Sequence, residues 1–509
     1  MKKSIEILFV IAVFAGGYFL IKTFPPKSAG EKPAPASSQE ITGESERAAE
    51  EKNSADGQKA EIKNVVLVTL DTVRADHYGF MGYPRNTTPF IDKLASEGIV
   101  FKNAFTVVSE TTPAHASIFT SLYPFEHHIT SNGLPLVGSR TLAEYLKSEN
   151  FITAGFVSAP YFDGIKNGFD VFNFDGNQNL NQGAGIKRRT ADETINKAVE
   201  WLGNSSPSDQ KIFLWVHLFD AHIPFSEGVN YDGGSNDRLS GDDLADFWVK
   251  NQGAVLNFFT GNEKESLSKV MNKYDGELQL EDKQVEKLFN SMSQKDLNKN
   301  TLWVITSDHG EGLGSHSYYD HFERVYNEQL KAPIIFYNPE VKNGKTIKSL
   351  VENIDILPTL ADLIGFKIEG HISGTSLIPL ISNPEQKSGD YIFSSRGGVV
   401  KVGLNEFATK YLPVKSPQDE EFLGDLYSLQ DGNYKRTYSP NDTRGDKLFD
   451  LKKDPNELNN LINKPGMRSM ADDMENKIQE ILKGNMGAVD NGEVRPDKLL
   501  EESLRALGY

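Results

Sequence analysis

Three runs of aliphatic and β-branched residues, far apart in the sequence, constrain the fold of this chain more than any other feature. They are Asn64 to Leu70, Lys211 to His217 and Thr301 to Thr306. Apolar runs without polar alternation are typical of strands that are buried on both faces. Helix-like segments alternate with such runs from residue 64 to about residue 365. The alternation predicts an α/β fold, with a mostly parallel sheet sandwiched by helices.

The pattern changes from about residue 376, where the segments become strand-like and polar, and a last helix is expected near Met470 to Leu482. We therefore expect a main domain at residues 62–375 and a smaller α+β subdomain at residues 376–509. Within the main domain, Ser226 to Asn262 is rich in Gly, Asp and Asn. This composition predicts a surface insertion near the mouth of the site.

The N-terminus is expected to anchor the chain in a membrane. It begins Met1-Lys2-Lys3, and residues 7–21 are uncharged and mostly apolar. A signal anchor over residues 1–22 is the preferred interpretation, with a cleaved signal peptide as the alternative. The two lysines would stay in the cytoplasm, which places the main domain outside it, in the periplasm or at the cell surface. Residues 25–61 contain no aromatic residue, so residues 23–61 are expected to form a disordered tether.

Composition argues against nucleic-acid binding and excludes cysteine chemistry. The net charge is −17, and no basic face is evident, which argues against nucleic acid as a partner. The chain contains no cysteine, so disulfides, thiolate catalysis and cysteine-ligated metals are excluded.

Polar residues follow the apolar runs where ligands collect in parallel sheets, at the carboxyl ends of the strands. Asp71 follows the first run, and Asp308 and His309 follow the third. Seven of the ten histidines lie in these few motifs or beside Thr111, at positions 77, 115, 217, 222, 309, 316 and 321. Asp71, Asp308, His309 and the Thr111 hydroxyl are predicted to hold a divalent cation. Zinc is the first choice because of the imidazole, with calcium or manganese as alternatives.

Thr111 precedes a helix-like run, and Pro113 suits the first turn of that helix. The N-terminus of a helix attracts anions, so a hydroxyl placed there is able to attack a phosphate-like group. The alternative is that Thr111 is an ordinary capping residue.

Several motifs in this order resemble the sulfatase family, within the alkaline phosphatase superfamily, over nearly everything after the tether. The motifs that carry the resemblance are Asn64 to Gly79 (NVVLVTLDTVRADHYG), Thr111 to Pro124 (TTPAHASIFTSLYP), Thr306 to His316 (TSDHGEGLGSH), Asp355 to Gly374 and Leu448 to Leu461. The resemblance implies an alkaline phosphatase-like fold, with a sulfatase-like catalytic domain at residues 62–375.

The chain departs from the family at the nucleophile. Sulfatases have a Cys or Ser there, oxidised to formylglycine, whereas this chain has Thr111, and His115 stands at the place of an arginine. Without a cysteine, or a serine in a matching context, no formylglycine is expected. A threonine at this place is similar to nucleotide pyrophosphatase/phosphodiesterases and lipid A phosphoethanolamine transferases, which use a zinc-activated threonine. The resemblance to the phosphodiesterases implies that Asn132 holds a phosphoryl oxygen.

The resemblance to the transferases implies roles for three histidines. His222 and His321 are expected to bind the phosphoryl group, hold a second cation or protonate the leaving oxygen, and His217 is a further candidate. The function expected is a membrane-anchored, metal-dependent hydrolase or transferase that acts on a phosphoester through a covalent phosphothreonine. The alternatives are a sulfuric ester hydrolase and a non-catalytic relative that binds an anion. Substrates would be small-molecule, lipid head-group or glycan esters.

The anchor leads to a first prediction. The full chain should pellet with membranes and resist extraction by alkaline carbonate, because a spanning helix is held by hydrophobic burial rather than by charge. Fractionation followed by immunoblotting measures this. A soluble form that begins near residue 25 would contradict the anchor and support the cleaved signal peptide.

Overall fold

The computed structural model describes most of the chain after residue 61. The described residues are 62–174, 188–205, 210–226, 228–233, 239, 241–252, 263–316, 318, 320–322, 324–340, 344–385, 389–396 and 424–486. The chain divides into compact units over Met1–Glu61 and Ile62–Tyr509, and all described residues belong to the second. The predicted anchor and tether lie outside the described residues. Within those residues, no helix combines the length and the apolar character that a membrane crossing needs.

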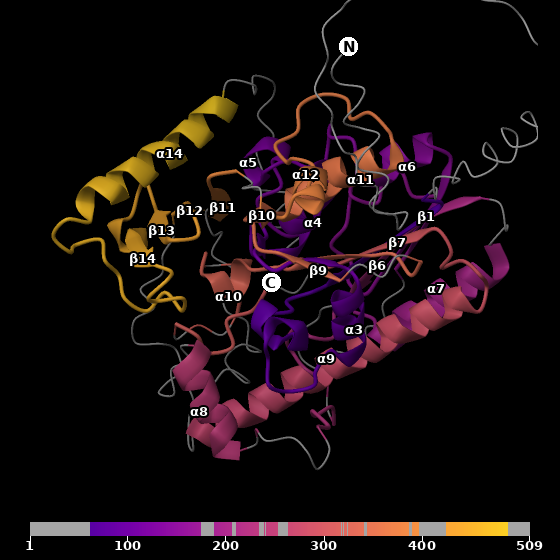
Figure 1. Ribbon diagram of the computed structural model, residues 1–509, viewed down its shortest axis with the longest axis horizontal. Coiled ribbons are helices and arrows are strands. Elements are labelled where there is room, and N and C mark those ends of the chain that lie inside the picture. The colour runs from indigo at the N-terminus through magenta and orange to yellow at the C-terminus, as the bar shows by residue number, and fades with distance from the viewer. Residues whose placement is uncertain are drawn as a thin grey trace, which may run out of the picture. The chain divides into compact units, whose positions relative to one another are not determined.

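An eight-stranded sheet forms the centre of the domain, in the order β5-β4-β6-β1-β7-β8-β2-β9 (Figure 1). The strands from β5 to β7 in this order are all parallel, whereas β8 runs antiparallel to β7 and β2. The prediction of a mostly parallel sheet is therefore confirmed. The strands are β1 (Asn64–Leu70), β2 (Ile99–Phe101), β4 (Phe151–Val157), β5 (Val171–Asn173), β6 (Lys211–Leu218), β7 (Thr301–Ser307), β8 (Ile334–Tyr337) and β9 (Lys345–Ile347).

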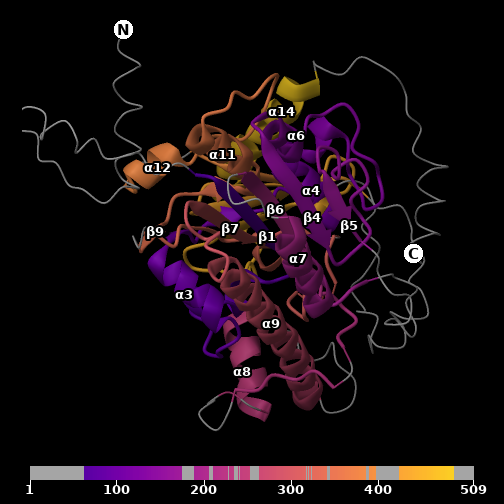
Figure 2. The ribbon, with the colours of Figure 1, turned by 90° about the vertical axis from the view of Figure 1, so that its right-hand side faces the viewer.

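Helices cover both faces of this sheet (Figure 2). On one face, α6 and α11 contact α4, and on the other, α3 and α7 pack against α9. Side chains alternate along a strand, so Val66, Val68 and Leu70 of β1 join the apolar core beside α9, and Thr69 faces α4. The helices are α3 (Pro89–Glu97), α4 (Thr111–Thr120), α6 (Leu142–Ser148), α7 (Ala191–Ser205), α9 (Glu263–Ser293) and α11 (Ile356–Ile364).

The segment from Ser226 to Asn262, which is predicted to be a surface insertion, includes in its described part the helix α8 (Gly241–Gln252), which was not expected. Trp248 of this helix is fully buried and stacks on His77, with 4.6 Å between the ring centroids. Burial of this large ring outweighs the polar composition of the segment.

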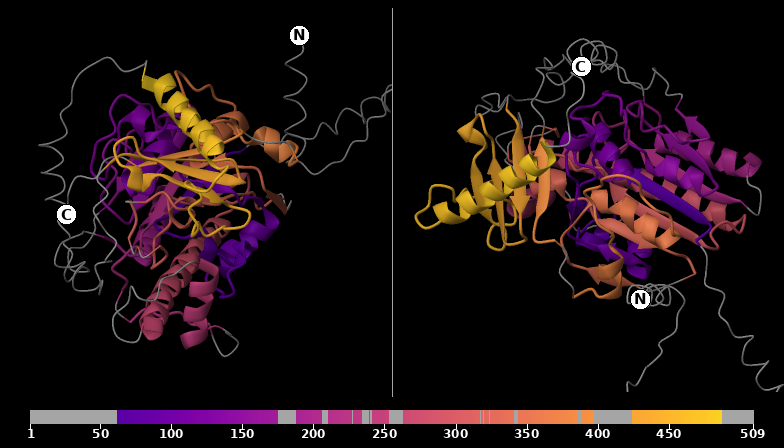
Figure 3. Two further views of the ribbon diagram at one scale, coloured as in Figure 1. Left: turned by 90° about the vertical axis from the view of Figure 1, so that its left-hand side faces the viewer. Right: turned by 90° about the horizontal axis from the view of Figure 1, so that it is seen from above.

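A smaller antiparallel sheet follows, in the order β11-β12-β13-β14. Helix α14 (Arg468–Met486) lies across one face of it, close to the last helix expected from the sequence (Figure 3). The boundary between residues 375 and 376 stays a prediction. The strands are β11 (Ile392–Arg396), β12 (Leu426–Gln430), β13 (Tyr434–Tyr438) and β14 (Lys447–Asp450).

His316 links the loop after β7 to the chain that follows the small sheet. Its Nδ1 lies 2.7 Å from Glu328 Oε1, and its Nε2 lies 3.2 Å from the Glu457 carbonyl oxygen. Both partners are acceptors, so the ring is held as an imidazolium, stacked flat on Tyr326. Burial opposes this charge, but the Glu328 and Glu457 carboxylates outweigh burial and raise the pKa of His316.

The raised pKa of His316 predicts how stability depends on pH. The charged ring stabilises the folded state fully below the unfolded pKa of about 6.5, and this contribution is lost as pH rises through the higher folded pKa. His316→Gln should therefore lower the free energy of unfolding by about 1–3 kcal/mol at pH 5.5 and by less at pH 9. Denaturant unfolding at both pH values measures the difference.

The matched control is His371→Gln, because His371 also contacts a carboxylate, that of Glu126, but its side chain is 65% exposed. That change should alter the free energy of unfolding by less than about 0.5 kcal/mol. A loss of unfolding free energy in His316→Gln that is larger at pH 9 than at pH 5.5 would contradict the charged state of His316.

Candidate active site

The register of three neighbouring strands brings the predicted site together. Thr69 of β1 pairs with His217 of β6 and with Thr306 of β7. The chain therefore leaves β1 and β7 at the same height, at Asp71 and Asp308, and the Thr72 N–H donates to Asp308 Oδ1 at 3.1 Å.

Helix α4 brings the hydroxyl of Thr111 to these carboxylates. The helix begins at Thr111, whose Oγ1 donates to Asp71 Oδ2 at 3.2 Å and lies 3.5 Å from His309 Nε2. All four predicted ligands are at most 1% exposed. The structure thus gathers Asp71, Thr111, Asp308 and His309 around one point.

The donor set fits a divalent cation. Asp71 Oδ1 and Asp308 Oδ2 are buried oxygens without a hydrogen-bond partner, and ligand atoms of Asp71, Asp308 and His309 lie within 4.8 Å of one another. His309 Nδ1 donates to the Gly310 carbonyl at 2.9 Å, which leaves the Nε2 lone pair for a metal. Burial lowers the pKa of His309 to about 4, so the ring is neutral, as a ligand must be.

The two carboxylates repel each other in the absence of a cation. Burial, and then the charge of Asp308, raise the pKa of Asp71 well above its ordinary value. A cation between the two groups removes this penalty, which is a physical reason for expecting one.

His321 and His222 lie beside the cation ligands. The ring of His321 is 4.6 Å from that of His309 and 4.9 Å from that of His222, centroid to centroid. His321 Nδ1 lies 3.1 Å from both Glu311 Oε2 and Asp320 Oδ1, so its Nε2 is left for a ligand. Burial opposes protonation of His321, but the two carboxylates outweigh burial and raise its pKa well above the ordinary value.

His222 has the opposite electrostatics. Burial, and then the charge of His321, lower its pKa well below the ordinary value, and its Nδ1 donates to the Ile223 carbonyl at 2.5 Å. His222 is therefore neutral, with its lone pair on Nε2. His321 can therefore donate a hydrogen bond from Nε2, and the neighbouring His222 can accept one at Nε2.

Asn132 is held against the first turn of α4. Its side-chain Oδ1 accepts from the Thr112 N–H at 2.7 Å, and its backbone N–H donates to Glu110 Oε1 at 2.5 Å. The amide carbonyl thus caps the helix, and Nδ2 is the donor that can hold an anionic oxygen. His217, the remaining predicted residue, lies one position before the end of β6, with Nε2 3.4 Å from Asp71 Oδ2.

Sequence reasoning missed the carboxylates that orient these groups. Glu311 and Asp320 hold His321, and Glu110 holds the Asn132 loop. Glu311 lies in the same Asp-His-Gly-Glu run as the cation ligands, and Asp320 immediately precedes His321. Sequence proximity was thus the available signal, but an acidic residue in a loop is most often solvated.

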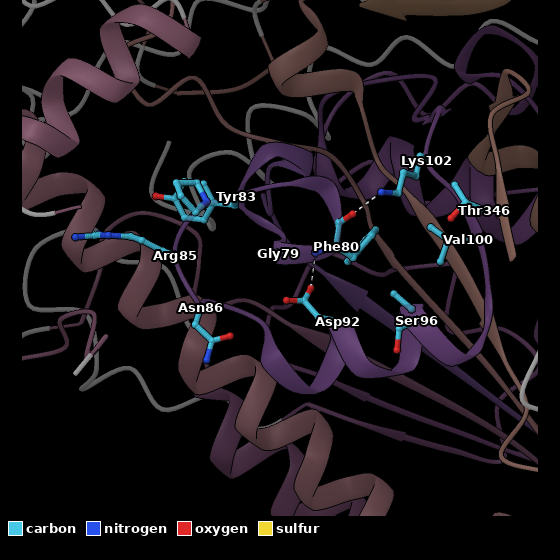
Figure 4. A pocket seen from close by; sticks show the side chains of 12 residues that line it. Gly79, Phe80, Tyr83, Arg85, Asn86, Asp92, Ser96, Val100, Lys102 and Thr346 are labelled. Atoms are coloured by element: carbon cyan, nitrogen blue, oxygen red, sulfur yellow. Dashed lines mark hydrogen bonds between the residues drawn. The ribbon is translucent and has the colours of Figure 1, made fainter. Parts of the chain in front are cut away.

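A separate cavity of about 520 Å³ lies beside α3 and β2 (Figure 4). Lys102 donates to the Phe80 carbonyl there, and Asp92 accepts from the Phe80 N–H. None of its lining residues belongs to the predicted site.

Comparisons with known proteins agree with the fold. The family model described as Sulfatase matches residues 63–366, which is more than half of the chain. An ulvan-active sulfatase of Formosa agariphila is 26% identical over 82% of this chain and 81% of its own length. An arylsulfatase of Clostridium perfringens is 24% identical over 84% of this chain and 96% of its own.

Among solved structures, the phosphonate monoester hydrolase of Agrobacterium radiobacter superposes with a TM-score of 0.64. It is 20% identical, and the match covers 83% of this chain and 96% of the other. At this identity the likeness concerns the fold, and it agrees with the alkaline phosphatase-like sheet.

The cation ligands lead to a prediction that needs no substrate. Asp71→Asn and Asp308→Asn should each abolish tight binding of Zn²⁺, because each removes a buried charged oxygen from the ligand set. Isothermal titration calorimetry with Zn²⁺, Ca²⁺ and Mn²⁺ measures the loss and ranks the ions. Asp92→Asn, which alters a carboxylate of the separate cavity, is the matched control and should leave binding unchanged. Undiminished affinity in both site variants would refute the ligand set.

Proposed function

The chain belongs to the sulfatase family, and from that premise we propose that it hydrolyses or transfers a phosphoester through a covalent phosphothreonine at Thr111. Hydrolysis of ester bonds is the activity that family membership supports in general. One observation carries the choice of phosphoester. The family's aldehyde-forming residue is replaced by a threonine whose hydroxyl, at the head of α4, contacts the cation ligands Asp71 and His309.

Thr111 acts as the nucleophile. Its hydrogen is directed at Asp71 Oδ2, so the lone pairs of Oγ1 are left for in-line attack on phosphorus. As the Oγ1–P bond forms, the Thr111 proton passes to Asp71 Oδ2, and the bond from phosphorus to the leaving oxygen breaks. A divalent cation held by Asp71, Asp308, His309 and Thr111 would lower the pKa of the hydroxyl and neutralise ester charge.

Three further side chains act on the ester oxygens. The Asn132 amide, beside the N-terminus of α4, binds a non-bridging oxygen. His321, oriented by Glu311 and Asp320, donates a proton to the leaving oxygen from Nε2. His222 positions the group through its Nε2.

The second step decides between hydrolase and transferase. Water releases phosphate or phosphonate from Thr111, or an acceptor alcohol takes the group. We assign zinc as the cation because imidazole is among the ligands. We further propose that residues 1–22 anchor the enzyme, with the catalytic domain in the periplasm or at the cell surface, within reach of lipid head-group and glycan esters.

Hydrolysis of a sulfuric ester is the second candidate. The relatives support it better than they support the phosphoester, since the ulvan-active enzyme and the arylsulfatase are sulfatases. The same Asn132, His222 and His321 would bind the oxygens of a sulfuryl group. The observation against it is Thr111, which cannot supply the formylglycine that the family uses.

Substitution of the nucleophile tests the proposal. Thr111→Ala should lower kcat by roughly four to six orders of magnitude, since the attacking oxygen is lost. Thr111→Ser keeps a hydroxyl at the same place and should retain much of the activity. Initial rates on an aryl sulfate, an aryl phosphate, a phosphodiester and a phosphonate monoester measure both effects and rank the substrates.

Mass spectrometry of the quenched reaction should find a phosphoryl adduct on Thr111. If the wild type prefers the aryl sulfate, the chain is a sulfuric ester hydrolase and the phosphoester proposal is wrong. Retention of most activity by Thr111→Ala would mean that Thr111 is not the attacking group.

A further inference from the structure

The backbone of Thr72 has an unfavourable conformation beside the candidate cation site. Its φ angle is 55°, in the left-handed region that β-branched residues rarely enter. Thr72 directly follows the predicted ligand Asp71, and its side chain is fully buried. Such a conformation persists only where the surrounding structure holds it in place.

The side chain of Thr72 does not explain this conformation. Asparagine and aspartate are able to enter the left-handed region through a local side-chain hydrogen bond. Thr72 Oγ1, in contrast, is buried and has no hydrogen-bond partner among the residues that the structure describes. The backbone groups of Thr72 are bound instead by distant side chains. Its N–H donates to Asp308 Oδ1 at 3.1 Å, and its carbonyl oxygen accepts from the Tyr274 hydroxyl at 2.7 Å.

The Tyr274 hydroxyl binds the chain at two points of this turn. Tyr274 lies in α9, 202 positions from Thr72, and is fully buried. The hydroxyl donates its hydrogen to the Thr72 carbonyl oxygen and accepts from the Arg74 N–H at 2.9 Å. Loss of this one oxygen would take a hydrogen-bond partner from two buried backbone groups, which is unfavourable.

The next residue of α9 fixes the helix against the same part of the chain. Asp275 Oδ1 lies 2.6 Å from His77 Nδ1. Asp275 Oδ2 accepts from the Tyr83 hydroxyl and from Arg85 Nη1, both at 2.7 Å. These contacts set the place of the neighbouring Tyr274 relative to the turn that it binds.

The Arg74 side chain extends this restraint to the loop that follows Asp308. Its Nη1 donates to the carbonyl oxygens of Glu311 and Gly312, at 3.1 and 2.8 Å. The backbone N–H of the same arginine is bound by the Tyr274 hydroxyl. Tyr274 therefore restrains the segments that follow both strand ends of the candidate cation site.

We propose that Tyr274 is a positioning residue of the cation site. Its hydroxyl holds Thr72 in the left-handed conformation, and this keeps the carboxylates of Asp71 and Asp308 facing one point. Without the hydroxyl, Thr72 relaxes toward a negative φ angle, and its N–H moves away from Asp308. The proposal rests on the predicted cation ligands and not on the kind of ester that the chain acts on.

Cation binding to the full chain tests the proposal without a substrate. Tyr274→Phe removes the hydroxyl and retains the ring. It should raise the Kd for Zn²⁺ by about 10- to 100-fold in isothermal titration calorimetry, because the ligands lose their support. The absorption bands of the Co²⁺-loaded protein should shift as well, since they report the arrangement of the ligands.

Tyr145→Phe is the matched control. The Tyr145 hydroxyl also donates to a carbonyl oxygen and accepts from an N–H, both of Glu369, at 3.1 and 3.2 Å. This variant loses the same kinds of hydrogen bond and should keep the affinity and the Co²⁺ spectrum of the wild type. Equal losses of affinity in the two variants, or none in Tyr274→Phe, would overturn the proposal.

Glycine at position 72 tests whether the hydroxyl acts through this backbone. Glycine enters the left-handed region without a steric penalty, so Thr72→Gly combined with Tyr274→Phe should bind Zn²⁺ more tightly than Tyr274→Phe alone. No gain in the double variant would overturn the proposal. If Tyr274→Phe alone does not fold, the double variant should fold and bind Zn²⁺, and a double variant that is also unfolded would overturn it. All of these results are independent of the ester assays that test the proposed function.

Discussion

The repulsion between two buried carboxylates is the constraint on which the site depends. Asp71 and Asp308 leave neighbouring parallel strands at the same height, and each keeps an oxygen without a hydrogen-bond partner. Backbone N–H groups of Thr72 and His309 satisfy the other oxygen of Asp308. Holding these two carboxylates together in the folded state costs free energy, and a bound divalent cation would offset that cost.

The alternation of side chains along β1 keeps this pocket separate from the apolar core. Val66, Val68 and Leu70 pack beside α9, while Thr69 faces α4 and the histidines. The side chains that pack in the core and those that line the candidate site thus lie on opposite faces of one strand. The C-terminal part of the chain adds a further restraint, because His316 ties the loop that follows Asp308 to Glu457.

The residue at position 111 and the names of the relatives favour different esters. The relatives include sulfatases, and the fold is shared with a phosphonate monoester hydrolase. Sulfate and phosphate esters both present tetrahedral anionic groups, so the proposed donors Asn132 and His321 would serve either. The proposed nucleophile is the group that differs, and a threonine hydroxyl would suit transfer of a phosphoryl group.

The fold class, the strand ends that carry Asp71 and Asp308, and the helix that begins at Thr111 were all predictable from the amino-acid sequence. These follow from local patterns, because an apolar run and a proline in a first turn depend on nearby residues. The membrane anchor and the domain boundaries stay predictions.

The side chains that orient the predicted ones are visible only in the packed domain. Glu110 reaches the loop of Asn132, and Thr69 joins His115 to His217 across 46 and 148 positions of the chain. Such contacts are set by strand register and by the docking of α4, which no local pattern encodes. For the same reason α8 and its buried Trp248 escaped prediction, since burial is a property of the packed domain and not of the segment.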